Sequence, residues 1–248
     1  MQPSFESLRV FLIQARSNED ILKQEQDCFI ERCEIAPEQL DAVNVSEDPL
    51  PADLFNAYDA LFIGGAGEYS ATQDYTWTSG VLDAIREADD RSFPTFGSCW
   101  GHQMIARALG GEVKYDKERT EMGCHWVELN ERGTQDSLFQ HFPKRLKANM
   151  GHHDRVVTLP DSAIDLAFSD TQPHQAFRIG DKPIYGTQFH SELDAAREKA
   201  RLYAYRSHYT EVDSEEAFQA IIDGLAETTE VDGLLNKFLL SYVLAEAT

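Results

Sequence analysis

The residues best suited to chemistry in this chain surround Cys99, in the segment Phe96–Gly101 (FGSCWG). An apolar run leads into this segment, and residues 101–109, which have helical periodicity, overlap its end and continue beyond it. A nucleophile on a sharp strand-to-helix turn needs small neighbours, and glycine stands two residues before and two residues after the cysteine. At a helix N-terminus the positive end of the helix dipole favours the thiolate. The pattern therefore predicts a nucleophilic cysteine, with the N–H of Trp100 facing a developing oxyanion.

A histidine and a carboxylate, His190 and Glu192, end the segment Tyr185–Glu192 (YGTQFHSE). Residues two apart in an extended chain point to the same side. A carboxylate beside an imidazole orients the ring and stabilises its protonated form. The elbow pattern alone would fit a buried structural cysteine about as well as a nucleophile. The downstream pair favours a catalytic triad of Cys99, His190 and Glu192.

The elements that must position these residues alternate between short apolar runs and helical patterns. Strands are expected early in the chain at residues 9–15, 43–45, 60–63 and 93–96, and helices at 18–34, 76–88 and 101–109. This alternation predicts βα units and a mostly parallel sheet. The middle of the chain is richer in strands, at 113–115, 125–129, 155–159, 165–168, 175–179 and 183–189. After residue 193 the chain is expected to form roughly three helices.

We therefore predict an α/β fold with a mostly parallel sheet flanked by helices, some antiparallel strands and a C-terminal helical extension. The 248 residues allow one large or two small domains, and no repeat or long linker divides them. We expect one catalytic domain over residues 1–195. Residues 196–248 are expected to pack on the same domain as the helical extension.

Composition excludes several classes of function. A net charge of −21 repels the phosphate backbone, so we expect no nucleic-acid partner and attribute the acidity to solubility. No apolar run approaches the ~20 residues of a membrane span, and Met1–Arg9 lacks the pattern of a secretory signal. The cysteines show no paired spacing, which favours reduced thiols in the cytoplasm and no metal site: Cys28, Cys33, Cys99 and Cys124.

Four segments, in order, resemble the class I (triad) glutamine amidotransferases, which share a flavodoxin-like fold. GSCWGHQ at 97–103 is similar to that family's G-x-C-x-G-x-Q, and QFHSE at 188–192 to its Q-F-H-P-E. FIGGAG at 62–67 resembles a strand-end S-G-G-P segment, and MGHHDRV at 150–156 an S-H-x-D-x-V segment. The free-standing, GMP-synthase-like subgroup is the nearest in pattern. Departures at Ala66, Gly151, His153 and Ser191 leave the triad intact but put the substrate preference in question.

The resemblance implies a mechanism that needs no metal or organic cofactor. The Cys99 thiolate would attack the side-chain amide of glutamine, while N–H groups of Gly65 and Trp100 hold the oxyanion. His190, oriented by Glu192, would protonate the departing ammonia and then activate water against a γ-glutamyl thioester. The resemblance also places three residues at the substrate: Gly64, Gln103 and His152.

Several alternatives stay open. A γ-glutamyl amide or peptide hydrolase would use the same triad, because both reactions share the acyl-enzyme. A non-enzymatic regulatory module is disfavoured by the complete triad, and a second group of elbow-cysteine proteins is disfavoured because its histidine directly follows the cysteine, where Trp100 stands here. No G-x-x-x-x-G-K-[ST] segment is present, so any ATP-using acceptor reaction would require a separate synthetase subunit. The C-terminal helices could dock that partner or form a homodimer.

Overall fold

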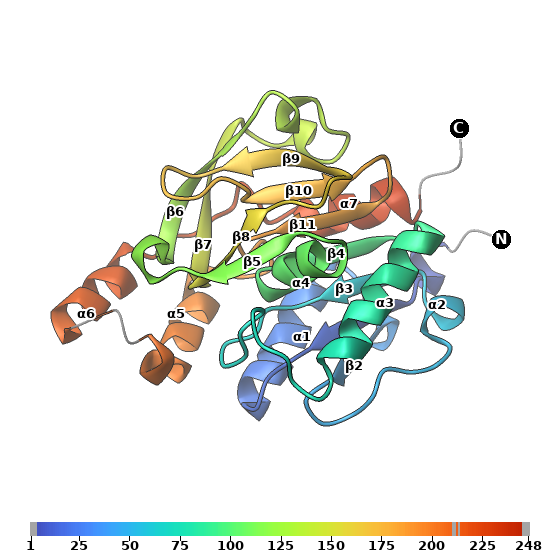
Figure 1. Cartoon of the computed structure of the whole chain (residues 1–248), viewed down its shortest axis with the longest axis horizontal. Helices are drawn as coiled ribbons and strands as arrows, with labels where there is room; N and C mark the ends of the chain where they lie inside the picture. The colour runs from blue at the N-terminus through green and yellow to red at the C-terminus, as the bar shows by residue number, and fades with distance from the viewer. Residues whose placement is uncertain (1–3, 210–211, 213, 245–248) are drawn as a thin grey trace.

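A large mixed sheet forms the centre of the molecule. The computed structural model describes residues 4–209, 212 and 214–244. Within them the main sheet has nine strands in the order β2-β1-β3-β4-β11-β10-β9-β6-β7 (Figure 1). The strands from β2 to β11 in this order run parallel, and the rest are antiparallel. Their bounds are β1 Val10–Gln14, β2 Leu40–Asn44, β3 Ala60–Ile63, β4 Thr95–Ser98, β6 Glu121–Leu129, β7 Arg145–His152, β9 Ala163–Phe168, β10 Ala176–Ile179 and β11 Ile184–Thr187. A smaller sheet pairs β5 (Glu112–Tyr115) with β8 (Asp154–Thr158).

Helices cover both faces of the parallel half of the sheet. One apolar cluster joins α1 (Glu19–Cys33) and α7 (Leu234–Tyr242) to one face. A second joins α3 (Thr78–Arg91) and α4 (Trp100–Ala108) to the other. The remaining helices are α2 (Leu54–Ala57), α5 (Ala195–Ala204) and α6 (Glu215–Gly224). No helix in the described part of the chain is long and apolar enough to cross a membrane.

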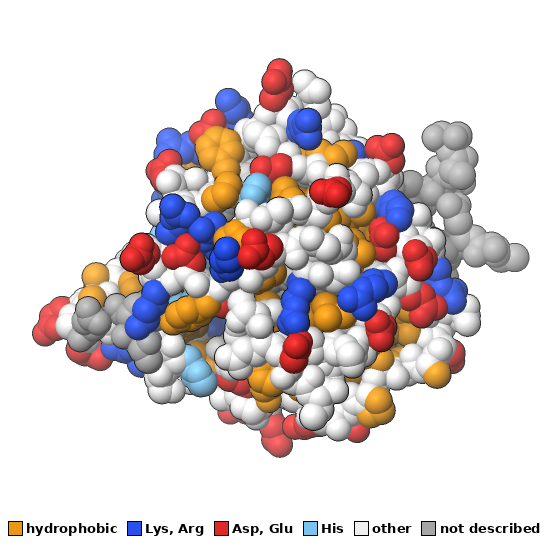
Figure 2. Space-filling model, viewed as in Figure 1, with side chains coloured by type: hydrophobic (Ala, Val, Ile, Leu, Met, Phe, Trp, Pro, Cys, Tyr) orange, Lys and Arg blue, Asp and Glu red, His pale blue; other side chains and the backbone are white. Residues whose placement is uncertain are grey.

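Burial on both faces explains the composition of the central strands. Every residue of β1, β3, β4 and β11 is buried, so these strands appear in the sequence as continuous apolar or small-residue runs rather than alternating ones. Many charged side chains lie on the surface, and Figure 2 shows carboxylates scattered among Lys and Arg on the face it presents. The predicted α/β fold class is confirmed by this architecture.

Two strands differ from the sequence-based expectation: β7 was not expected, and β6 begins at residue 121 instead of 125. Residues 150–156 were treated as one family segment, which hid the strand that ends at His152. The sequence does contain the alternation that is typical of a strand here. Leu146, Ala148 and Met150 are buried and alternate with Lys147 and other polar or small residues.

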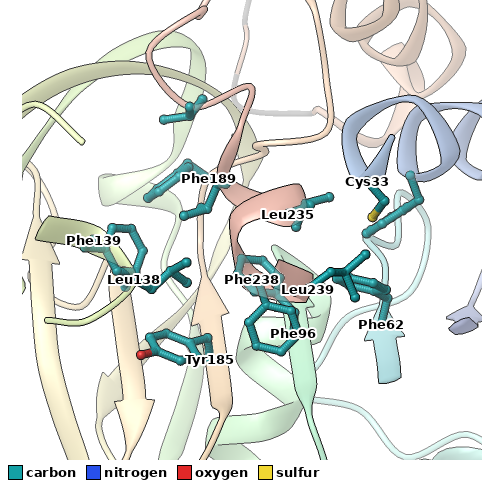
Figure 3. Packing of buried hydrophobic residues seen from close by; sticks show 14 of the residues in the cluster. Cys33, Phe62, Phe96, Leu138, Phe139, Tyr185, Phe189, Leu235, Phe238 and Leu239 are labelled. Atoms are coloured by element: carbon teal, nitrogen blue, oxygen red, sulfur yellow. The ribbon is translucent and has the colours of Figure 1, made fainter. Parts of the chain in front are cut away.

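The C-terminal helix α7 forms part of the main core. Phe238 packs its ring against those of Phe62, Phe96 and Tyr185, at centroid distances of 5.9, 5.5 and 6.0 Å (Figure 3). These partners lie on β3, β4 and β11, the strands that lead to the predicted site. A domain boundary at residue 195 stays a prediction.

Replacing Phe238 with alanine should lower the free energy of unfolding by ~3–5 kcal/mol, because it leaves a cavity between α7 and the central strands. Urea unfolding followed by circular dichroism measures this. Leu240→Ala on the same helix is the matched control, since Leu240 is 44% exposed. A loss below ~1 kcal/mol for Phe238→Ala would show that α7 is dispensable to the core.

Candidate active site

Cys99 stands on a strained turn between β4 and α4. Its backbone angles, φ 52° and ψ −101°, lie in a region that non-glycine residues rarely adopt. A Cβ on Gly97 would come within 2.5 Å of the Gly101 carbonyl carbon, and one on Gly101 within 2.2 Å of the Ile63 oxygen. Only glycine allows β3, β4 and α4 to approach so closely. The local geometry thus matches the predicted nucleophile elbow.

His190 connects the cysteine to a buried carboxylate. Its Nδ1 lies 2.6 Å from Oε1 of Glu192, and its backbone N–H donates to the Asn149 carbonyl at 3.0 Å. Burial opposes protonation of the ring, but the charge of Glu192, its hydrogen bond to the ring and the nearby Cys99 raise the pKa of His190 well above its usual value. The structure therefore brings the three predicted triad residues together, with a histidine that favours its protonated form.

Glu192 is fully buried and is held from several sides. Its second oxygen accepts a hydrogen bond from Ser98 Oγ at 2.8 Å, and Arg201 Nη1 lies 3.7 Å from the first. Burial alone would raise the pKa of Glu192, but the charge and hydrogen bond of His190, with the charge of Arg201, lower it to about 2. The carboxylate is thus ionised and fixed toward His190.

The two predicted oxyanion donors differ in whether their N–H groups already have an acceptor. The N–H of Trp100, at the first position of α4, has no hydrogen-bond acceptor within the described residues and is available to a ligand. The N–H of Gly65 instead donates to Glu25 Oε1 at 3.1 Å. Gly65 does lie beside the reacting groups, because a Cβ on it would be 3.2 Å from His190 Cε1 and 3.9 Å from Cys99 Cβ. Its oxyanion role stays a prediction and requires its N–H to leave Glu25.

A pocket of about 140 Å³ opens on Cys99 and holds two of the three predicted substrate-binding residues. Gln103 donates from its amide to the Asp154 carbonyl at 2.6 Å and to Gln188 Oε1 at 3.0 Å. His152 is fixed between the Asp154 carbonyl, at 3.0 Å, and Glu121, at 3.1 Å. Gly64 does not line this pocket, because its N–H and carbonyl bond Ile13 and Gly101, so the structure does not bring it to the substrate.

Buried charges behind the triad were missed in the sequence. Arg16 and Glu25 form an ion pair at 2.6 Å with side chains 2% and 0% exposed. Arg201 of α5 lies 3.6 Å from Glu25 and 3.7 Å from Glu192, so one guanidinium stands between the two carboxylates. Gln188 was also missed, although it stands two residues before His190 and its amide lies 3.7 Å from the Cys99 sulfur. Its spacing from His190 was the available signal.

The described residues contain no group of three or more His, Cys, Asp or Glu side chains that could hold a metal ion. The cysteines predicted to be reduced are free thiols here, and Cys28 and Cys33 are buried.

The family model for class I glutamine amidotransferases matches residues 24–215. The match covers most of the chain, which therefore belongs to the class I glutamine amidotransferase family, and the resemblance seen in the sequence is confirmed.

Relatives within the family agree with the GMP-synthase-like pattern. The chain is 30% identical over 154 residues to a subunit of the glutamine-hydrolyzing GMP synthase of Sulfurisphaera tokodaii, covering 62% of this chain and 77% of that one. It is 29% identical over 147 residues to Gamma-glutamyl peptidase 4 of Arabidopsis thaliana, covering 58% of each. The crystal structure of a glutamine amidotransferase from Thermotoga maritima superposes with a TM-score of 0.76 at 26% identity, over 96% of this chain and 99% of that one.

Replacing Glu192 with glutamine should reduce stability in a pH-dependent way. A carboxyl group whose pKa falls from 4.5 to about 2 on folding stabilises the protein above pH 4.5, and this contribution is lost as the pH falls toward 2. We expect a deficit on the order of 3 kcal/mol at neutral pH, which shrinks below pH ~4.5. Urea unfolding from pH 3 to pH 7 measures it, with exposed Glu131→Gln as control. A deficit that does not change with pH would contradict the argument.

Replacing Glu25 with glutamine should destabilise the protein by ~3–5 kcal/mol, because Arg16 and Arg201 then keep a buried, uncompensated charge. Asp27→Asn on the same helix removes an exposed pair with Lys23 and should cost less than ~1 kcal/mol. Chemical unfolding of both variants distinguishes a buried ion pair from a surface one. Equal effects would contradict the assigned role of Glu25.

Proposed function

We propose that this protein hydrolyses the side-chain amide of glutamine to glutamate and ammonia through a γ-glutamyl thioester on Cys99. The observation that carries the proposal is the position of His190, whose Nδ1 lies 2.6 Å from Glu192 and which lines the same small pocket as Cys99. Cys99 stands on the strained elbow as the nucleophile, and the raised pKa of His190 suits it to give a proton to the leaving nitrogen. Family membership supports the same activity.

The reaction would proceed in two halves. The Cys99 thiolate adds to the amide carbon, and the oxyanion that forms is held by the N–H of Trp100. His190 gives its proton to the amide nitrogen, the C–N bond breaks, and ammonia leaves the thioester. His190 then takes a proton from water, whose oxygen attacks the thioester carbon and releases glutamate. Glu192 stabilises the imidazolium in each half.

We propose a separate acceptor of the ammonia. The relatives from Sulfurisphaera tokodaii and Pyrococcus abyssi are both named for one subunit of a glutamine-hydrolyzing GMP synthase, and this chain covers 77% and 56% of their lengths. Those names support two proposals: that glutamine is the substrate of this chain, and that a synthetase subunit is its partner. Homodimerisation through the C-terminal helices stays a prediction that light scattering after size exclusion would test.

A second candidate is hydrolysis of larger γ-glutamyl amides or peptides. The likeness to Gamma-glutamyl peptidase 4 of Arabidopsis thaliana favours it, and the same acyl-enzyme serves both reactions. The pocket next to Cys99 would hold the γ-glutamyl group in either case. The two candidates differ in what leaves from the other side of the amide bond.

Purified protein should release glutamate and ammonia from L-glutamine, and Cys99→Ala should lower the rate by at least ~1,000-fold. Cys124→Ala is the matched control, because Cys124 is a free thiol outside the site. Coupled assays for glutamate and ammonia measure both products, with γ-glutamyl amides tested in parallel. Turnover of those amides but not of glutamine would favour the second candidate, and no Cys99-dependent turnover of either would contradict both.

A further inference from the structure

A second, much smaller pocket adjoins the first at Cys99. Its volume is about 20 Å³, and its walls include Arg16, Cys99, His190, Glu198, Arg201 and Tyr205. It shares Cys99 with the larger pocket but contains His190, which the larger one does not. A cavity of this volume has room for about one molecule the size of water.

The position of His190 decides which part of a substrate enters each pocket. The acyl carbonyl oxygen must lie near the free N–H of Trp100, which lines the larger pocket together with Gln103. The leaving nitrogen must lie within reach of the histidine that protonates it. The small pocket is therefore on the side where the leaving group departs.

Glu198 is the feature of this small pocket that the mechanism does not use. Its side chain comes from α5, is only 2% exposed and lines the small pocket, and its carboxylate makes no hydrogen bond to another side chain of the described residues. A Cβ on Gly151, which lines both pockets, would lie 3.2 Å from Glu198 Oε1, so the carboxylate points toward the space beside Cys99. Burial raises the pKa of Glu198 against the charges of His190 and Arg201. Buried polar groups rarely lack a partner, and one aimed into a pocket indicates a ligand.

We infer that the small pocket is a leaving-group subsite for ammonia, and that Glu198 determines its specificity by filling the space a larger amine would need and by accepting a hydrogen bond from the departing nitrogen. This inference rests on the proposed function. In the step concerned, the proton of His190 passes to the amide nitrogen and the C–N bond breaks. The neutral ammonia then leaves with one N–H directed at a Glu198 oxygen.

The same subsite suits the second half of the reaction. Water is close to ammonia in size and can occupy the vacated place, with one O–H toward His190 and the other toward Glu198. An N-alkyl group on the amide would instead meet the buried side chains of Glu198, Arg16 and Arg201, of which the two arginines are held by ion pairs with Glu25. The inference thus favours glutamine over γ-glutamyl peptides.

The test compares L-glutamine with its γ-N-methyl and γ-N-ethyl amides in the wild type, Glu198→Ala, Glu198→Gln and the exposed control Lys199→Ala. One misplaced methyl group in a rigid pocket reduces kcat/KM by ~10–200-fold, so the wild type should prefer glutamine by at least ~10-fold. Glu198→Ala should reduce that preference by ~10-fold or more by vacating space. Glu198→Gln keeps the volume, and so should keep the preference while lowering kcat/KM for glutamine. Lys199→Ala should change neither quantity.

The outcomes separate this subsite from the proposed function. Two results would overturn the subsite and leave the glutaminase proposal standing. In the first, the wild type hydrolyses the alkyl amides as fast as glutamine. In the second, Glu198→Ala slows all three substrates equally. Absence of Cys99-dependent glutamate release from all three overturns both. If Glu198→Ala does not fold, as judged by circular dichroism, Glu198→Gln decides, because an unchanged kcat/KM for glutamine would overturn the role of the carboxylate.

Discussion

The close approach of α4 to β3 and β4 is the constraint on which the site depends. Gly101 donates from its N–H to the Gly64 carbonyl at 3.1 Å, so the first turn of the helix is tied directly to the end of β3. Any side chain at Gly97 or Gly101 would force the helix away from the sheet. This contact fixes the strained backbone of Cys99 and the first turn of α4, where Trp100 lines the pocket. The position of the predicted nucleophile is thus set by backbone packing rather than by contacts of its own side chain.

A buried network of charges connects the predicted triad to helices α1 and α5. Glu192 on one side and Glu25 on the other both face Arg201, whose Nη atoms make no hydrogen bond within the described residues. Since Glu25 also binds Arg16 and the N–H of Gly65, the triad carboxylate and the predicted oxyanion glycine are coupled through one guanidinium. That guanidinium belongs to α5, so a helix beyond the recognisable motifs supports the electrostatics of the site.

The parts of the site that could be predicted from the sequence are those encoded locally. His190 and Glu192 stand two residues apart in one short segment just after β11, so both could be recognised together in the sequence. Glu25 and Arg201 could not be identified in this way, because charged residues on helices are normally exposed. Their burial depends on α5 packing beside α1, where Arg201 also donates to Gln24 at 3.0 Å. This contact joins segments far apart in the sequence and leaves no periodic signal.

The parts of the fold that could be predicted are likewise those that a local sequence pattern encodes. Strands buried on both faces form continuous apolar runs, such as β3 at Ala60–Ile63, which matched the predicted range.

The hydrogen bond that occupies the Gly65 N–H was not predictable from the sequence. The pair Gly64-Gly65 at the end of a strand suggested an N–H that is available to a ligand. In the structure that N–H is held by a carboxylate, a charge-assisted bond worth ~1.5–3 kcal/mol. An oxyanion would have to outcompete Glu25 for this donor, whereas it would meet no competitor within the described residues at Trp100. Of the two predicted oxyanion donors, Trp100 therefore depends only on the elbow, and Gly65 depends also on the charges around Glu25.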